Sequence, residues 1–207
     1  MIRVGLALLL WLPGLALALE VGLVTGLSGA VTVQGQAVQA FAKLHEGERL
    51  SLGDKARVQL VLFASGAEQI WQGPGELQVA ADDVLALSQG LSPQVRQLPR
   101  VLVRQLAKTP APDGQIKAGM VRLRSMPSGG TLESVENRYS QLRREAARED
   151  RNPELYLLAS YFELQEYAKL QGLLQKMAKA EPEDAQVKLL QSLYARAISN
   201  ARNAAAP

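Results

Sequence analysis

Apolar and polar side chains alternate in short runs over residues 19–90. In one of these runs, Val58, Leu60 and Leu62 fall on one face of an extended chain, which is typical of a half-buried strand. Turn-forming residues separate the runs at short, fairly regular intervals: Gln34 to Gln36, Gly47, Gly53 with Asp54, Ser65 with Gly66, Gly73 to Gly75, and Asp82 with Asp83. The pattern predicts an all-β domain of short strands over residues 19–90.

From Thr131 onward the apolar positions recur every three or four residues, as expected of an amphipathic helix. The first stripe consists of Leu132, Val135, Tyr139, Leu142 and Ala146. A second helix is expected to start with Asn152 as its N-cap and Pro153 in its first turn, and two more apolar runs follow. We therefore predict an α+β fold in two parts, with a helical domain over residues 131–199 and a flexible tail over 200–207.

Residues 91–130 are expected to connect the two parts through a helix, a linker and a strand. Residues 91–108 predict a helix with Ser92 as its N-cap, and residues 117–125 have the pattern of a strand that could pair back onto the β domain. On a continuous helix, four basic side chains would form a stripe opposite Leu98, Leu102 and Leu106: Arg96, Arg100, Arg104 and Lys108. Such a stripe is expected either to face solvent or to dock on the acidic β domain. The alternative is that it binds an anionic bilayer or polymer.

The first eighteen residues have the three-part layout of an export signal. Arg3 precedes an apolar run, and small residues end it at Ala18. We predict cleavage after Ala18. The alternative is an uncleaved anchor, although the apolar run is shorter than the roughly 20 residues that a spanning helix needs. The chain has no cysteine, which excludes disulfides, thiol chemistry and cysteine-based metal sites.

The two parts carry opposite charge. Residues 19–90 have four basic and eight acidic side chains, a net charge of −4, whereas residues 91–207 have eighteen basic and twelve acidic side chains, a net charge of +6. The parts are expected to attract each other, or the second part to face an anionic surface. Export excludes nucleic acid as an expected partner, despite this basic half.

Residues 26–38 and 46–79 together resemble a FecR domain. The family's G-x-x-L-x-x-G-D turn corresponds to Gly47, Leu50, Gly53 and Asp54, and Ser65–Gly66 stands where the family usually has Asp-Gly-Ser. The alternating strand of the family matches Val58, Leu60 and Leu62, and its closing strand matches Leu77 and Val79. The resemblance implies a compact β fold and a bacterial envelope protein, and hence a periplasmic location.

The helices near the C-terminus resemble one tetratricopeptide hairpin. With Pro182 at the closing proline of that repeat, two sets of residues fall on its packing positions: Leu157, Leu158 and Tyr161 on the first helix, and Leu170, Leu174 and Met177 on the second. A generic antiparallel bundle is the alternative. Since a single repeat cannot bury its apolar face alone, the flanking helices are expected to cover it.

Little in the sequence points to catalysis. The only histidine, His45, is expected in a turn, and Asp82 and Asp83 are expected to form a turn rather than a catalytic pair. We find no catalytic set, no metal or cofactor motif, and no sign of a small-molecule substrate. An unfamiliar hydrolase would need Glu46, Asp82 and His45 to converge.

The sequence therefore predicts a non-enzymatic periplasmic scaffold or sensing protein that contacts other envelope proteins. The alternative is a peptidoglycan or anionic glycan binding module that uses Trp71 together with the basic stripe. Trp71 lies in a predicted short strand, however, where we expect burial in the core rather than a platform on which sugars stack.

Overall fold

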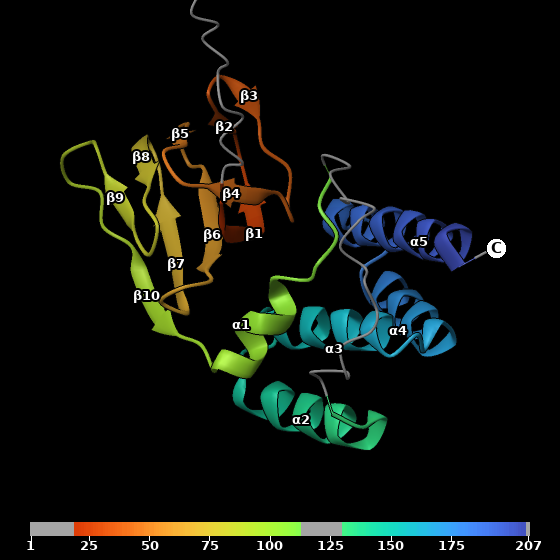
Figure 1. Cartoon of the computed structure of the whole chain (residues 1–207). Helices are drawn as coiled ribbons and strands as arrows, with labels where there is room; N and C mark the ends of the chain where they lie inside the picture. Colours follow the sequence, from red (N-terminus) through yellow and green to blue (C-terminus); the bar gives the residue numbers. More distant parts are fainter. Residues whose placement is uncertain (1–18, 113–129, 206–207) are drawn as a thin grey trace, which may run out of the picture.

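Ten strands form two five-stranded antiparallel sheets in the computed structural model, which describes residues 19–112 and 130–205 (Figure 1). Sheet A has the order β10 (Gln94–Gln97), β7 (Ala67–Gln72), β6 (Arg57–Leu62), β1 (Glu20–Ser28), β4 (Lys43–His45). Sheet B has the order β3 (Gln36–Ala37), β2 (Val31–Val33), β5 (Arg49–Leu52), β8 (Gly75–Val79), β9 (Val84–Ala86). Five helices follow or join these strands, so the chain has the predicted α+β composition, with the β part first.

The predicted turns fall between these strands. Gly29, between β1 and β2, has φ +75°, and a Cβ at this position would lie 2.9 Å from Ala56 Cα. A side chain there would be strained and would also collide with the neighbouring backbone. The turn-forming residues in the sequence therefore indicated where the strands end, because these turns require backbone conformations that few residue types adopt.

One face of sheet A packs against sheet B and forms the first hydrophobic core. Val58, Leu60 and Leu62 of β6 point into this core, as their alternation predicted. Trp71 of β7 lies in the same core with 2% of its surface exposed. Burial of these large side chains stabilises the sandwich without any disulfide.

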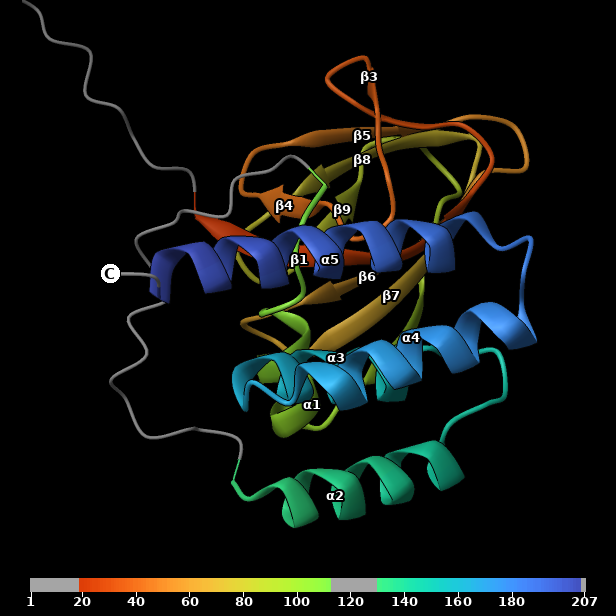
Figure 2. The ribbon, with the colours of Figure 1, turned by 90° about the vertical axis from the view of Figure 1, so that its right-hand side faces the viewer.

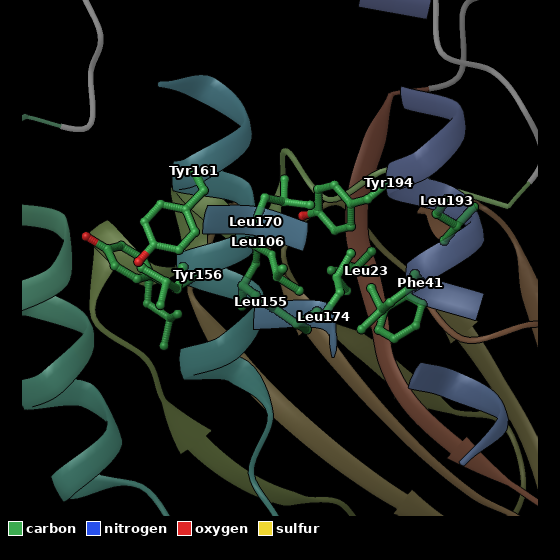
Figure 3. Packing of buried hydrophobic residues seen from close by; sticks show 14 of the residues in the cluster. Leu23, Phe41, Leu106, Leu155, Tyr156, Tyr161, Leu170, Leu174, Leu193 and Tyr194 are labelled. Carbon is green, nitrogen blue, oxygen red and sulfur yellow. The ribbon is translucent and has the colours of Figure 1, made fainter. Parts of the chain in front are cut away.

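The opposite face of sheet A packs against the helices and forms a second core. Leu23 of β1, Val61 of β6 and Phe41 belong to this cluster, each with no exposed surface. Figure 3 shows Leu23 and Phe41 beside Leu174 and Leu193 of the helical part. Sheet A is therefore a middle layer whose central strands are buried on both faces, and the β part and the helical part are packed together.

The helices are α1 (Arg100–Leu106), α2 (Leu132–Glu145), α3 (Asn152–Glu163), α4 (Tyr167–Ala180) and α5 (Ala185–Ala205). Helix α3 is central, because it contacts α1, α2 and α4, while α4 contacts α5 (Figure 2). The expected stripe on α2 faces inward, with Val135 and Leu142 buried and Leu132 and Tyr139 partly buried. Thr131 caps α2 by accepting a hydrogen bond from the backbone N–H of Ser134.

The predicted helix over residues 91–108 is wrong in its first half. Residues Gln94–Gln97 form strand β10, which pairs with β7 in register Gln94↔Ile70 to Gln97↔Ala67. The helix α1 begins only after Pro99, which occupies its N-cap position. The free edge of β7 offered backbone partners for these residues, and periodicity within the segment could not reveal that edge.

Two smaller expectations at helix ends also differ from the structure. Asn152 is the first residue of α3 rather than its cap, and its backbone N–H donates to Asp150 Oδ1 at 2.9 Å. Helix α5 continues to Ala205, so residues 200–205 are helical where a flexible tail was expected. Arg202, in this last stretch, lies over the ring of Tyr167 with its Cζ 5.8 Å from the ring centroid.

Several expectations concern residues outside those that the structure describes. These are the export signal over residues 1–18, the predicted strand over 117–125, and most of the linkers that flank it. Among the described helices, none combines the length and the apolar character needed to cross a membrane.

Candidate functional site

The four residues of the predicted basic stripe do not share one helix. Arg96 lies on β10, Arg100 and Arg104 lie on α1, and Lys108 follows α1. Lys108 Nζ is 2.7 Å from Glu163 Oε2, so its charge is engaged inside the helical part. Only Arg100 and Arg104 project outward together, opposite the buried Leu102 and Leu106. A continuous cationic surface of four side chains is therefore absent from the described part of the chain.

Arg96 joins the two parts of the molecule. Its Nε donates to Glu68 Oε2 at 2.8 Å, and its Nη2 donates to Asp150 Oδ2 at 2.6 Å. The pKa of Arg96 is raised: burial, the largest effect, acts to lower it, but the hydrogen bond to Asp150 and the charges of Glu68 and Asp150 outweigh burial. Because Arg96 lies on β10, its ion pair with Glu68 is a contact between neighbouring strands of sheet A, and its ion pair with Asp150 links the sheet to the segment before α3. The expected docking of a basic helix on the β domain therefore does not describe Arg96.

Glu68 is the centre of a buried polar network. Only 2% of this residue is exposed, on the face of β7 that meets the helices. Besides Arg96, its carboxylate accepts hydrogen bonds from Gln59 Nε2 at 2.8 Å and from Asn152 Nδ2. A buried carboxylate is tolerated when donors surround it in this way, so the network fixes how sheet A and the start of α3 lie against each other.

Trp71 is unavailable to a ligand. Its ring is enclosed between the sheets, and its Nε1 donates to Gln69 Oε1 at 3.0 Å. Of the two readings of this residue, burial is confirmed and stacking on a glycan is not, because the strand that carries Trp71 turns the ring into the core rather than toward solvent.

The candidates for catalysis form local contacts. His45 lies on β4, and its Nδ1 is 3.1 Å from Glu48 Oε1 within the following turn. Asp83 accepts from Gln69 Nε2 at 2.6 Å and from the backbone N–H of Val84, between β8 and β9. No hydrogen bond or ion pair joins His45, Glu46 and Asp82 to one another. Among the described residues, no group of three histidine or acidic side chains is arranged to hold a metal ion.

A cleft of about 250 Å³ lies between the sheet and the helices; we call it the polar cleft. Its sheet wall comes from β1 and the start of β6, with Thr25, Gly26, Arg57 and Gln59. Its helix wall comes from the segments where α3 and α5 begin: Glu149, Arg151, Asn152, Asp184 and Gln186. Nearly every side chain that lines the polar cleft is polar.

The helix wall of the polar cleft is held by an ion-pair cluster. Arg151 binds both Asp184 and Glu181, and Asp184 Oδ1 also accepts from the backbone N–H groups of Gln186 and Val187 at the start of α5. The hydrogen bond from Arg151, with these backbone donors, lowers the pKa of Asp184 to about 2. The pKa of Arg151 is raised, since its hydrogen bonds and ion pairs outweigh the lowering effect of burial.

Sequence reasoning missed the residues that organise this region. Glu68 and Gln59 lie within predicted strands, and nothing in the residues around Glu68 distinguishes it from the other polar positions of those strands. Gln186 and Arg57 gave no signal, because the polar cleft arises only when strands and helices meet. No family model, curated protein or solved structure matches this chain.

Exposed apolar side chains lie at one border of the β sandwich. This border is opposite the one formed by β3 and β4. Strands β9 and β10 are the outer strands of their sheets and lie at one side of the molecule (Figure 1). Leu85 is 51% exposed, Leu87 is 45% exposed and Val95 is 60% exposed. We call these three residues and the two strand edges the edge surface.

Proposed function

We propose that this protein is a non-enzymatic component of the bacterial envelope, a periplasmic scaffold or sensing protein that acts through contacts with other proteins. In this proposal residues 19–90 form a FecR-like β domain, and the helices form a tetratricopeptide-like interaction module. The export signal and the FecR resemblance support the location. The two-sheet β part and the packed helices are compatible with both resemblances.

The edge surface is the observation that carries this proposal. Outer strands of soluble proteins are usually protected by charged side chains, prolines or a covering segment, because their free backbone groups pair readily with another chain. Here β10 has all four residues exposed, and the charge of Arg96 on this strand is paired with Glu68 and Asp150. Val95 and Leu85 add apolar surface beside edges with which no other described strand pairs. We expect an extended segment of an envelope protein to pair with this border and to bury these side chains.

The helical part supports the same kind of function. Leu157, Leu158 and Leu170 are buried where a tetratricopeptide hairpin would place its packing residues, with Leu174 also buried and Met177 partly buried. Arrays of this type use their outer surfaces to bind peptides or other proteins.

A site-specific crosslinking experiment in the native envelope tests the proposal. A photoreactive amino acid at Val95 is expected to capture a defined protein, whereas one at Gln36, on the opposite outer strand of sheet B, is not. Val95→Lys combined with Leu85→Lys should abolish capture by a probe placed at Leu87, because charges oppose burial of the edge. Gln36→Lys is the matched control. Equal crosslinking at Val95 and Gln36, or capture that survives the paired lysine substitutions, would contradict the role of the edge surface.

Most of the residues on which the glycan-binding alternative depended are not available to bind a glycan. Trp71 is enclosed in the core, and Arg96 and Lys108 are engaged by carboxylates of the protein itself. Arg100 and Arg104 alone do not distinguish a polymer-binding face from a solvated helix.

A further inference from the structure

We propose that the polar cleft binds a small zwitterion, namely a free amino acid or a dipeptide with unblocked ends. This site is separate from the edge surface and does not depend on the protein–protein role proposed above. The inference comes from the space in the polar cleft, from the orientation of two amide groups, and from a free charge on each wall.

On the sheet wall, Gly26 leaves space in the polar cleft because it has no side chain. A Cβ at Gly26 would lie 3.7 Å from Gln59 Oε1 and 3.9 Å from Gln186 Oε1, so two side-chain oxygens border the same point. The volume of about 250 Å³ is below the 300–1,000 Å³ of sites for drug-sized ligands. The polar cleft therefore suits a ligand of amino-acid or dipeptide size.

The orientation of both amides is fixed by chemistry. Gln59 Nε2 donates to the carboxylate of Glu68, and Gln186 Nε2 donates to the carbonyl oxygen of Leu27 at 3.0 Å. Since carboxylates and carbonyls only accept, the nitrogen of each amide must occupy these positions. The two Oε1 atoms are left as acceptors beside Gly26, and neither has a hydrogen-bond donor among the described residues. Two convergent acceptors favour a group rich in N–H donors, such as an ammonium.

The walls carry opposite free charges. Arg57 belongs to the sheet wall and Glu149 to the helix wall, and both are exposed. Neither side chain has an ion pair or a hydrogen bond with any other residue that the structure describes. A guanidinium can bind a carboxylate through two parallel hydrogen bonds, and a carboxylate attracts an ammonium. Arg57 therefore supplies the contact for the carboxylate of the ligand, while Glu149 adds negative potential to the amide oxygens.

Neighbouring polar residues already hold the two glutamine side chains that would contact the ligand, so less conformational freedom is lost when it binds. Gln59 is held through the buried Glu68, and Asp184 and Arg151 hold the start of α5, which carries Gln186. Preorganised groups of this kind raise affinity because fewer side chains must be ordered when the ligand arrives.

The test uses isothermal titration of the purified protein with three probes: Ala-Ala, N-acetyl-Ala-Ala, which lacks the ammonium, and Ala-Ala-amide, which lacks the carboxylate. Ala-Ala is expected to bind. Each blocked probe is expected to bind at least tenfold more weakly, because it lacks one of the two charged groups and therefore one charge-assisted hydrogen bond. NMR of the protein should show shifts of the Gln59 and Gln186 side-chain amides with Ala-Ala.

Variants assign the binding to the polar cleft. Arg57→Gln should weaken Ala-Ala at least tenfold and remove the preference for Ala-Ala over Ala-Ala-amide, whereas Arg100→Gln, an exposed arginine on α1, should change neither. Gly26→Leu should fill the polar cleft and abolish binding, with circular dichroism used to verify that the variant folds. No binding of Ala-Ala, equal binding of the three probes, or an unchanged preference in Arg57→Gln would each overturn the proposal. The last result remains decisive if Gly26→Leu fails to fold.

Discussion

At the scale of single residues, the interface between sheet and helices depends on a few polar side chains in fixed geometry. Glu68 is buried and accepts hydrogen bonds from Arg96, Gln59 and Asn152. Burying a carboxylate is costly unless donors compensate for lost hydration, so each of these partners contributes more than a surface contact would. Sequence patterns identify a residue type at a position but give no account of which distant donors will surround it.

Asp184 gives a pH-dependent prediction at this scale. The folded-state pKa of Asp184 is lowered to about 2 from its ordinary value of 3.8. Its contribution to stability is therefore fully present above pH 4 and is lost as the pH falls toward 2. Asp184→Asn, which keeps a residue able to cap α5, should reduce the free energy of unfolding by about 2 kcal/mol at pH 6 and by less than about 0.5 kcal/mol at pH 2.

Urea unfolding of both proteins at the two pH values measures this difference. Glu183→Gln is the control, because Glu183 is highly exposed and should show little change at either pH. An equal loss for Asp184→Asn at pH 6 and pH 2 would show that its carboxylate charge is not the stabilising feature.

At the scale of elements, sheet A is unusual for an antiparallel sheet because both of its faces are covered. On β6, Leu60 faces sheet B and Val61 faces the helices, and neither has exposed surface. The apolar run 60–62 is therefore continuous, whereas a sheet with one solvated face would alternate strictly. The sequence contained this clue, since Val61 interrupts the alternation of Val58, Leu60 and Leu62.

Val61→Ala tests whether the second face of sheet A is part of the folding core. We expect this substitution to lower the free energy of unfolding by about 1–2 kcal/mol, because it removes two buried methyl groups and leaves a cavity under the helices. Val95→Ala, on the exposed β10, should change it by less than about 0.5 kcal/mol. Chemical denaturation compares the two, and equal effects would mean that the helices do not pack tightly on this face.

Strand β10 shows why an element can be predicted incorrectly. Arg96 is four residues before Arg100, a spacing that fits a helix, but residues 94–97 lie beside an edge of β7 and complete sheet A instead. Pro99 then sets the start of α1, where its missing N–H is not needed. Backbone hydrogen bonding to a distant strand outweighed local periodicity.

At the scale of the whole molecule, the two parts are not independent domains joined by a linker. The second core contains residues of both parts, such as Leu23 and Phe41 with Leu155 and Tyr194. The ion pair Arg96–Asp150 links sheet A to the segment before α3, but most of the contact between the two parts is apolar. Burial of apolar surface therefore stabilises the docking of the two parts.

We therefore predict that the protein unfolds in one transition. Trp71 fluorescence, which reports on the β part, and circular dichroism at 222 nm, which reports on the helices, should give coincident thermal curves. Arg96→Gln should shift both curves down together, by a loss of roughly 3 kcal/mol, because it leaves Glu68 buried without its cationic partner. Arg100→Gln should leave both in place. Two separate transitions, or a shift of only one signal, would contradict a shared core.

Patterns within the amino-acid sequence predicted the order of the two parts, most strand boundaries and the buried faces of the C-terminal helices. These features depend on local chemistry: turns that require glycine or aspartate, alternation in strands, and apolar spacing in helices. Leu157, Leu158 and Leu170 are buried as their spacing predicted.

The packing of the folded chain, in contrast, pairs Arg96 with Glu68, encloses Trp71 and creates the polar cleft beside Gly26. Each of these facts depends on contacts between residues far apart in the chain, such as Glu68 with Asn152 and Leu27 with Gln186. Local sequence specifies which side chains can donate, accept or be buried. Which partners they meet is set by the packing of sheet A against the helices, because that packing brings the distant segments within hydrogen-bonding distance.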